Sequence, residues 1–123
     1  MNCLDTSFIV DLLRGNGKAV KKYGEMRGGA LSTTAITAFE LLQASAGKQS
    51  GMINDILSKL DVLEFGLDEA LEAAEIEKEL KAKGAMINKL DVLIAGIARR
   101  RNLTLVTADK DFKKIPELQV SGY

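Results

Sequence analysis

The chain has 123 residues, 46% of them hydrophobic, and is long enough for one domain to bury a core. Its 17 basic and 17 acidic residues balance, so no general attraction to nucleic acid is expected. There is no histidine, which excludes Ser-His-Asp and Cys-His catalysis and leaves oxygen ligands for any metal. The apolar stretches are far shorter than the ~20 residues of a membrane helix. The start "MNCLDTSFIVDLL" lacks a basic leader, so a cytoplasmic, single-domain protein over residues 1–123 is expected.

The first half of the chain alternates short apolar runs with amphipathic segments. Glycines such as Gly15 and Gly47 mark helix ends, and Thr34 precedes an apolar helical pattern as an N-cap. The sequence predicts strands at residues 2–4 and 30–33, and helices over 6–15, 18–27, 35–47 and 50–60.

The second half continues this alternation. It predicts a strand at 62–65, helices over 67–84 and 89–101, a strand at 103–107, a turn at 108–112 and an edge strand at 118–123. Strands alternating with helices favour an α/β fold of three layers (αβα), with a short, mainly parallel central sheet. Such sheets bind ligands beyond the carboxyl ends of their strands, where Asp5 and Asp109 fall.

Four acids stand in apolar surroundings with few charged neighbours. Glu40 is the only ionisable residue between Arg27 and Lys48, beside Phe39, Leu41 and Leu42, which we expect to be buried. Asp91 is the only charge in "LDVLIAGIA". Local explanations remain open for each acid: Asp5 could cap the first helix, Asp109 could cap the short turn ahead of Phe112, Asp91 could favour a helix N-terminus, and Glu40 could lie on a narrow solvent stripe.

Other charges have simpler interpretations. We expect a solvated helix face for Glu69, Glu72, Glu75, Glu77 and Glu79. Asp11 can pair with Arg14 at helical spacing. Arg99, Arg100 and Arg101 favour the C-terminal end of their helix.

If Asp5, Glu40, Asp91 and Asp109 converge, each close pair repels by roughly 4 kcal/mol at about 4 Å and an effective dielectric near 20. Such a cluster stays ionised around a cation or else takes up protons. In a chain without histidine, a hard divalent metal is the economical solution.

Four segments together resemble a PIN domain of the VapC toxin type: "NCLDTSFIVDLLR", "TAFELL", "INKLDVLIAGIA" and "LVTADKDF". The resemblance covers the whole chain and implies a ribonuclease that cleaves single-stranded RNA with one or two Mg²⁺ or Mn²⁺ ions. It assigns Asp5 and Asp91 as metal ligands, Asp109 as a direct or water-mediated ligand, and Glu40 as a ligand of a second metal or as the residue that orients water. Thr6 and Thr107 would orient the carboxylates, and Asp111 matches a less regular fifth acid. A glycine often found near the fourth acid is absent from "TADKDF".

The resemblance also implies partners. A VapB-type antitoxin would place its tail in the acidic site, and the toxin would form a homodimer. From the residues, the apolar sides of the helices at 18–27 and 50–60 could supply grooves for a partner or could equally be ordinary core faces. Basic residues near the motifs are candidates for RNA contact: Arg14, Lys89, Lys110, Lys113 and Lys114. The alternative is a PIN-fold module that binds RNA or protein without turnover.

Overall fold

A five-stranded sheet runs through the molecule in the order β3-β2-β1-β4-β5, with every neighbouring pair parallel. The computed structural model describes all 123 residues. The strands are β1 (Asn2–Leu4), β2 (Leu31–Thr34), β3 (Asp61–Leu63), β4 (Thr104–Val106) and β5 (Gln119–Ser121). The predicted parallel sheet, with an edge strand near the C-terminal end, is confirmed. The chain builds outward from β1 to β2 and β3, then returns to the other side of β1, so β1 and β4 flank the switch point at which such sheets bind ligands.

Six α-helices connect and cover these strands: α1 (Thr6–Leu13), α2 (Gly17–Met26), α3 (Ala35–Ala44), α4 (Lys48–Ser58), α5 (Leu67–Lys83) and α6 (Lys89–Arg100). A 3₁₀ helix, η1 (Lys110–Lys114), follows β4 where a turn was expected. The prediction of a helix through residue 47 was wrong, because α3 ends at Ala44 and Gly47 turns the chain with a φ of 59°. No helix combines the length and apolar character needed to cross a bilayer.

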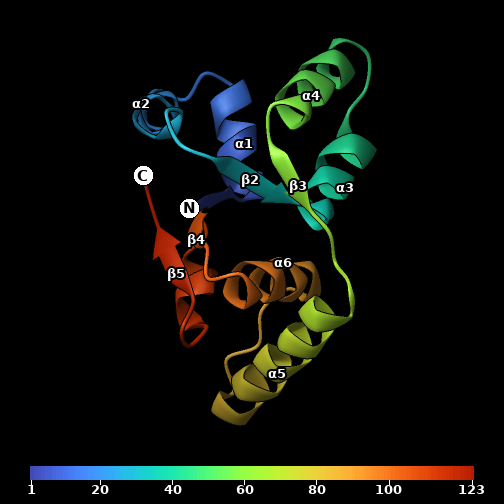
Figure 1. Cartoon of the computed structure of the whole chain (residues 1–123), viewed down its shortest axis with the longest axis vertical. Helices are drawn as coiled ribbons and strands as arrows, with labels where there is room; N and C mark the ends of the chain where they lie inside the picture. The colour runs from blue at the N-terminus through green and yellow to red at the C-terminus, as the bar shows by residue number, and fades with distance from the viewer.

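Two hydrophobic cores lie on opposite faces of the sheet. Side chains alternate along each strand, so Cys3 and Leu105 join the core beneath α5 and α6, whereas Leu4 and Val106 join the core beneath α1, α3 and α4. Figure 1 shows α1–α4 in the upper part of the molecule and α5 and α6 in the lower part, with strands between them. The three-layer prediction is therefore confirmed.

Helices α5 and α6 pack closely because Gly96 has no side chain. A Cβ atom at Gly96 would lie 2.8 Å from Cβ of Ala73, nearer than side-chain atoms approach in real structures. The close contact fixes α6, whose first turn carries Asp91.

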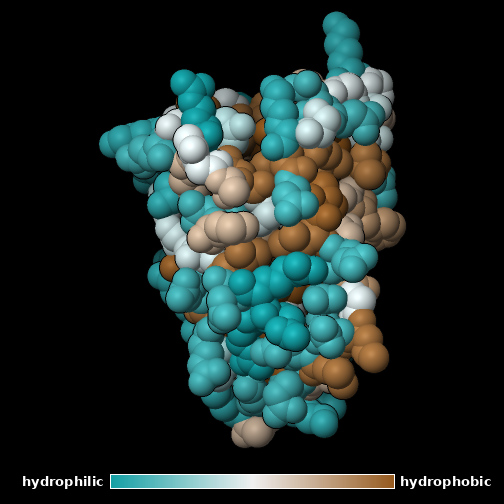
Figure 2. Space-filling model, viewed as in Figure 1, coloured by the Kyte–Doolittle hydropathy of each residue, from teal (hydrophilic) through white to brown (hydrophobic).

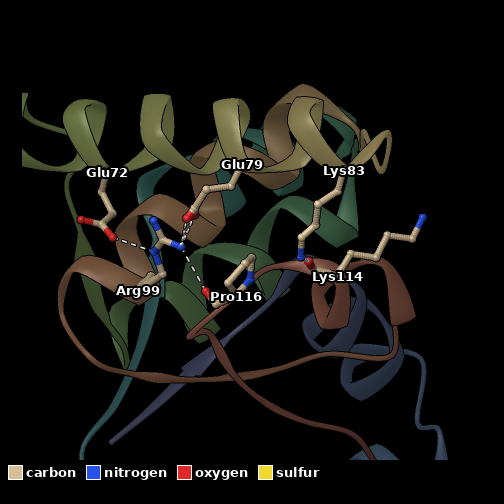
Figure 3. Close-up of polar contacts among 6 residues, drawn as sticks. All are labelled: Glu72, Glu79, Lys83, Arg99, Lys114 and Pro116. Atoms are coloured by element: carbon tan, nitrogen blue, oxygen red, sulfur yellow. Dashed lines mark hydrogen bonds and ion pairs between the residues drawn. The ribbon is translucent and has the colours of Figure 1, made fainter.

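A buried guanidinium reinforces this helix pair. The Arg99 side chain is 8% exposed; its Nε lies 2.6 Å from Glu72 Oε2 and its Nη1 lies 2.7 Å from Glu79 Oε1. Nη1 also donates to the carbonyl oxygen of Pro116 at 3.0 Å, which joins α5, α6 and the segment before β5 (Figure 3). The expectation of a solvated face at Glu72 and Glu79 was thus wrong: tertiary packing supplies a cation from another helix.

Two further expectations about α5 are corrected. Glu69 is 7% exposed, and its Oε1 accepts a hydrogen bond from the backbone N–H of Gly66 at 2.8 Å, which caps the helix. Glu77 forms an ion pair with Lys89. Lys83 donates to the carbonyl oxygen of Lys114 (Figure 3).

Helix α1 also differs from expectation. Asp11 does not pair with Arg14; its Oδ2 accepts a hydrogen bond from the hydroxyl of Tyr123 at 2.6 Å. The Tyr123 ring packs edge-on against Phe8 with centroids 5.0 Å apart. The residues after β5 are therefore held against α1.

Part of α3 is exposed although its sequence is apolar. Leu41 is 4% exposed, as expected, but Phe39 is 60% and Leu42 is 46% exposed, so the prediction that both are buried was wrong. Met52 of α4 and Val62 of β3 are also exposed. Figure 2 shows apolar surface over the part of the molecule where α3, α4 and β3 lie, and mainly hydrophilic surface over α5 and α6; the start of α5, where Leu67 and Leu71 are exposed, is apolar.

Candidate metal centre

The four predicted acids come from four different elements around one edge of the sheet. Asp5 follows β1, Asp109 follows β4, Glu40 lies on α3 and Asp91 lies in the first turn of α6. The backbone N–H of Asp5 donates to the carbonyl oxygen of Val106 at 3.0 Å, so the ends of β1 and β4 are joined side by side. The carboxyl ends of these strands therefore define the site.

Asp5 is the most enclosed of the acids, with 3% of its surface exposed. Its Oδ2 accepts hydrogen bonds from Thr107 Oγ1 at 2.6 Å and from Ser7 Oγ at 3.0 Å. Its Oδ1 is buried and has no hydrogen-bond partner. Although Asp5 occupies the N-cap position of α1, its side chain makes no capping hydrogen bond, so capping does not explain this residue.

Ser7 is a site residue that the sequence analysis missed. Besides donating to Asp5, its Oγ accepts from the backbone N–H of Ala108 at 3.2 Å and lies 3.1 Å from Thr107 Oγ1. Thr107 Oγ1 in turn accepts from the backbone N–H of Asp109 at 3.0 Å. The available signal was a hydroxyl two positions after an acid at a strand end. Ser7 and Thr107 tie together the loops that follow β1 and β4.

Glu40 is held by a different hydroxyl. Thr6 Oγ1 donates to Glu40 Oε1 at 2.7 Å and lies 3.0 Å from Thr37 Oγ1. Thr6, which follows Asp5 in sequence, therefore contacts the acid on α3. The two threonines expected to orient carboxylates contact two different acids, Glu40 and Asp5.

Asp109 and Asp111 lie at the start of η1. Asp109 Oδ1 accepts from the backbone N–H of Asp111 at 2.9 Å, which caps η1 and leaves its second oxygen for other ligands. Asp111 Oδ1 lies 3.0 Å from Lys114 Nζ in an exposed ion pair. Capping and metal binding are thus compatible at Asp109.

The other acids act electrostatically on Asp91. Burial, followed by the negative charges of Asp5, Asp109, Glu40 and Asp111, raises the pKa of Asp91 to about 6. Burial also raises the pKa of Asp5; hydrogen bonds from Thr107 and Ser7 oppose this shift and the charge of Glu40 adds to it. Negative charges that are up to 106 positions apart in sequence, from Asp5 to Asp111, therefore act together on Asp91.

These residues fit a hard divalent cation in their donor chemistry. All the candidate ligands are carboxylates, and the buried, unpartnered Oδ1 of Asp5 is an oxygen without a protein donor. No three acids are arranged here as a closed ligand set. Asp5, Asp91 and Asp109, with Glu40 beside them, are the residues that could hold such an ion.

A cavity of about 560 Å³ adjoins Glu40. Thr6 and Glu40 form part of its wall, Arg14 adds a cation, and α1, α3 and α4 supply apolar residues that include Met52 and Ile53. Of the other candidates for RNA contact, Lys110 and Lys113 are exposed on η1, whereas Lys89 pairs with Glu77.

Comparison with known proteins agrees with the fold. The family model for the PIN domain matches residues 3–118. The ribonuclease VapC of Rickettsia bellii is 33% identical over 128 residues, covering 95% of this chain and 92% of that protein. The tRNA(fMet)-specific endonuclease VapC of Shigella flexneri is 25% identical over 126 residues, covering 98% and 96%.

Solved structures give the same result. VapBC2 from Rickettsia felis bound to a promoter DNA fragment superimposes with a TM-score of 0.85 at 25% identity, covering 99% of this chain and 98% of that chain. VapBC-1 from nontypeable Haemophilus influenzae gives a TM-score of 0.85 at 25% identity, covering 98% and 96%. The chain therefore belongs to the PIN domain family and, within that family, to the VapC-type ribonucleases.

Proposed function

We propose that this protein is a metal-dependent endoribonuclease that hydrolyses single-stranded RNA, and that it is the toxin of a VapBC-type toxin–antitoxin pair. The observation that carries the proposal is the buried, unpartnered Oδ1 of Asp5, together with the raised pKa of Asp91, on which Asp5 and three further carboxylates act. Negative charge without a compensating partner is costly to bury unless a cation binds to it. The relatives named as ribonucleases and endonucleases support RNA as the substrate.

Each residue has a defined task in this mechanism. Mg²⁺ or Mn²⁺, as one or two ions, would supply Lewis acidity and a lower pKa for a bound water. Thr107 and Ser7 hold Oδ2 of Asp5, which leaves Oδ1 free for the ion. Asp91 and Asp109 would complete the ligand set. Glu40, held by Thr6, would orient the attacking water or bind a second ion.

An antitoxin and a second toxin copy are the proposed partners. The similar solved structures are VapBC complexes, which supports a VapB-type antitoxin. The cavity beside Glu40 offers an apolar wall and the cation of Arg14 to an acidic or amphipathic segment. Of the two helices expected to supply grooves, α4 lines this cavity and α2 does not. We place the protein in the cytoplasm, where RNA and such an antitoxin would meet it.

Cleavage of RNA by the purified protein tests this function. A mixed RNA pool and initiator tRNA are incubated with Mg²⁺, with Mn²⁺ and with EDTA, using the wild type, Asp5→Asn, Asp91→Asn and the distant control Asp68→Asn. Cutting that needs metal, is lost in the two site variants and persists in the control would support the proposal. Folded, metal-loaded wild type that binds RNA without cutting it would instead favour the non-catalytic binding module. Cutting that survives both site substitutions would show that the acids are wrongly assigned.

A further inference from the structure

Basic residues are concentrated in one stretch of this neutral chain. Between positions 12 and 39 the only charged residues are five cations and one acid, Glu25, a net charge of +4. The cations are Arg14, Lys18, Lys21, Lys22 and Arg27. The remainder of the chain therefore carries a net negative charge, and the charge is segregated along the molecule.

None of these five cations has a carboxylate partner, a property that they share with some basic residues elsewhere, such as Lys78 and Lys81. Six other basic residues of the chain form ion pairs, but none of these five does. Lys18 and Lys21 are exposed on α2, and Arg14 is exposed at the end of α1. Unpaired cations that lie together, as Lys18, Lys21 and Lys22 do, create a positive potential that attracts a polyanion.

The surface of α2 is hollowed where these lysines lie. A depression of about 300 Å³ is lined by Lys18, Lys21, Lys22 and Glu25 of α2 and by Gly122 and Tyr123 after β5. The wall opposite α2 is held in place, because the Tyr123 ring packs on Phe8 and its hydroxyl binds Asp11. We call this depression the α2 hollow.

A short series of hydrogen bonds connects the α2 hollow to the acidic centre. Lys22 Nζ donates to Ser121 Oγ at 2.9 Å, and the carbonyl oxygen of Ser121 accepts from the backbone N–H of Thr107 at 3.1 Å. Thr107 Oγ1 then donates to Asp5 Oδ2 at 2.6 Å. In this series Ser121 is the one residue between Lys22 of the α2 hollow and Thr107, which holds Asp5.

We propose that the α2 hollow binds backbone phosphates of the RNA next to the scissile bond, with Lys18 and Lys21 as the phosphate contacts. This inference rests on the proposed nuclease function. An acidic centre repels phosphates, so a chain of zero net charge needs a local cationic surface to hold its substrate. The α2 hollow supplies such a surface and is connected to Asp5 through Ser121 and Thr107, whereas Lys89, chosen from the sequence, is engaged by Glu77.

A paired set of variants tests this surface. Lys18→Gln/Lys21→Gln removes two charges from the α2 hollow, and Lys78→Gln/Lys81→Gln removes two exposed, unpaired charges from α5 as the matched control. Lys22 is left unchanged because its hydrogen bond helps to hold Ser121. Binding of a fluorescein-labelled single-stranded RNA is measured by anisotropy in EDTA from 50 to 300 mM salt. A labelled deca-glutamate peptide is titrated in parallel, and RNA cleavage is measured with Mg²⁺.

Losing two phosphate contacts on single-stranded RNA reduces the slope of log K against log salt by about 1.4, equivalent to about tenfold weaker binding near 0.15 M. We expect this change for Lys18→Gln/Lys21→Gln and less than twofold for the α5 control. If both pairs of substitutions weaken RNA binding equally, the effect is one of general charge and the proposal is overturned. Weaker peptide binding with unchanged RNA binding would also overturn it, because the surface would then bind an acidic protein segment. If the wild type cuts RNA and the α2 variant binds RNA normally, phosphate binding by the α2 hollow is refuted and the proposed nuclease function still stands. Wild type that neither binds nor cuts RNA would refute both.

Discussion

Replacing Asp91 by Asn is expected to stabilise the metal-free protein at neutral pH while abolishing cleavage. The carboxylate of Asp91 lies among other acids, and no hydrogen bond to its side chain compensates for burial. Asparagine keeps the shape of the side chain and removes the charge. The substitution therefore relieves repulsion that the folded protein tolerates for the sake of a metal ligand.

The size of the effect follows from the pKa. A carboxyl with a pKa of 3.8 when unfolded and about 6 when folded is destabilised by about 3 kcal/mol at neutral pH, if the shift is converted fully. Asp91 is only half-buried, so solvent screening reduces this to about 1–2 kcal/mol. Loss of the helix-dipole interaction in the first turn of α6 subtracts several tenths more. We expect a net gain of about 1 kcal/mol in the free energy of unfolding.

The sign of the pH dependence is also determined. The folded state holds the Asp91 proton more tightly than the unfolded state, so this site loses stability as pH rises from about 4 through about 6. The gain in Asp91→Asn should therefore be about half as large at pH 5 as at pH 7.5. Mg²⁺ at ten times its Kd should stabilise the wild type by about 1.4 kcal/mol and the variant much less.

Urea unfolding in EDTA at pH 5 and 7.5, repeated with Mg²⁺, measures these quantities. Asp68→Asn is the control, because Asp68 also lies in the first turn of a helix but is exposed and paired with Arg100. The control should be neutral or slightly destabilised at both pH values. An Asp91→Asn protein less stable than wild type at pH 7.5 in EDTA would refute the argument that acids repel one another at this centre.

Three further substitutions probe the structure around the site. Arg99→Met should lower the free energy of unfolding by about 2 kcal/mol, because it leaves two carboxylates without their cation; an unchanged urea midpoint would contradict this. Thr107→Val should lower the free energy of unfolding by about 1 kcal/mol and reduce cleavage, because Asp5 loses its shortest hydrogen bond. Thr107→Ser should keep the stability and the cleavage of the wild type. Equal cleavage by the two variants would argue against an orienting role for Thr107. Gly96→Ala should cost about 1–3 kcal/mol, seen as a lower Tm, because the new methyl group meets Ala73; an unchanged Tm would mean that the helices can separate freely.

The order of elements was readable because its signals are local. The periodic spacing of apolar residues acts within a few residues. So do N-caps such as Thr34 and helix-ending glycines such as Gly84, whose φ is 64°. The acids at strand ends were readable for a related reason: in a parallel sheet the carboxyl ends of strands meet at one edge wherever the strands lie in the chain. The assignment of ligand roles to these acids stays a prediction until metal binding is measured.

Contacts between distant segments were not readable. Local spacing offered Asp11 an arginine three residues away, but the folded chain brings Tyr123 to it from 112 positions away. Glu72 and Glu79 fitted a solvated stripe until α6 placed Arg99 between them. In both cases a partner from another element competes with water, and helical periodicity carries no information about that partner.

The sequence by itself determined the alternating α/β pattern, the set of isolated acids and the restriction to oxygen ligands, since these depend on residue type and short spacing. Tertiary structure alone decided that Ser7 and Thr107 share Oδ2 of Asp5, that Oδ1 is left free, and that α2 places its lysines beside Gly122 and Tyr123. Such geometry depends on strand register and helix docking. Strand register and helix docking are set by packing over the whole chain, because many residues from different elements contribute together to the free energy of burying each face of the sheet.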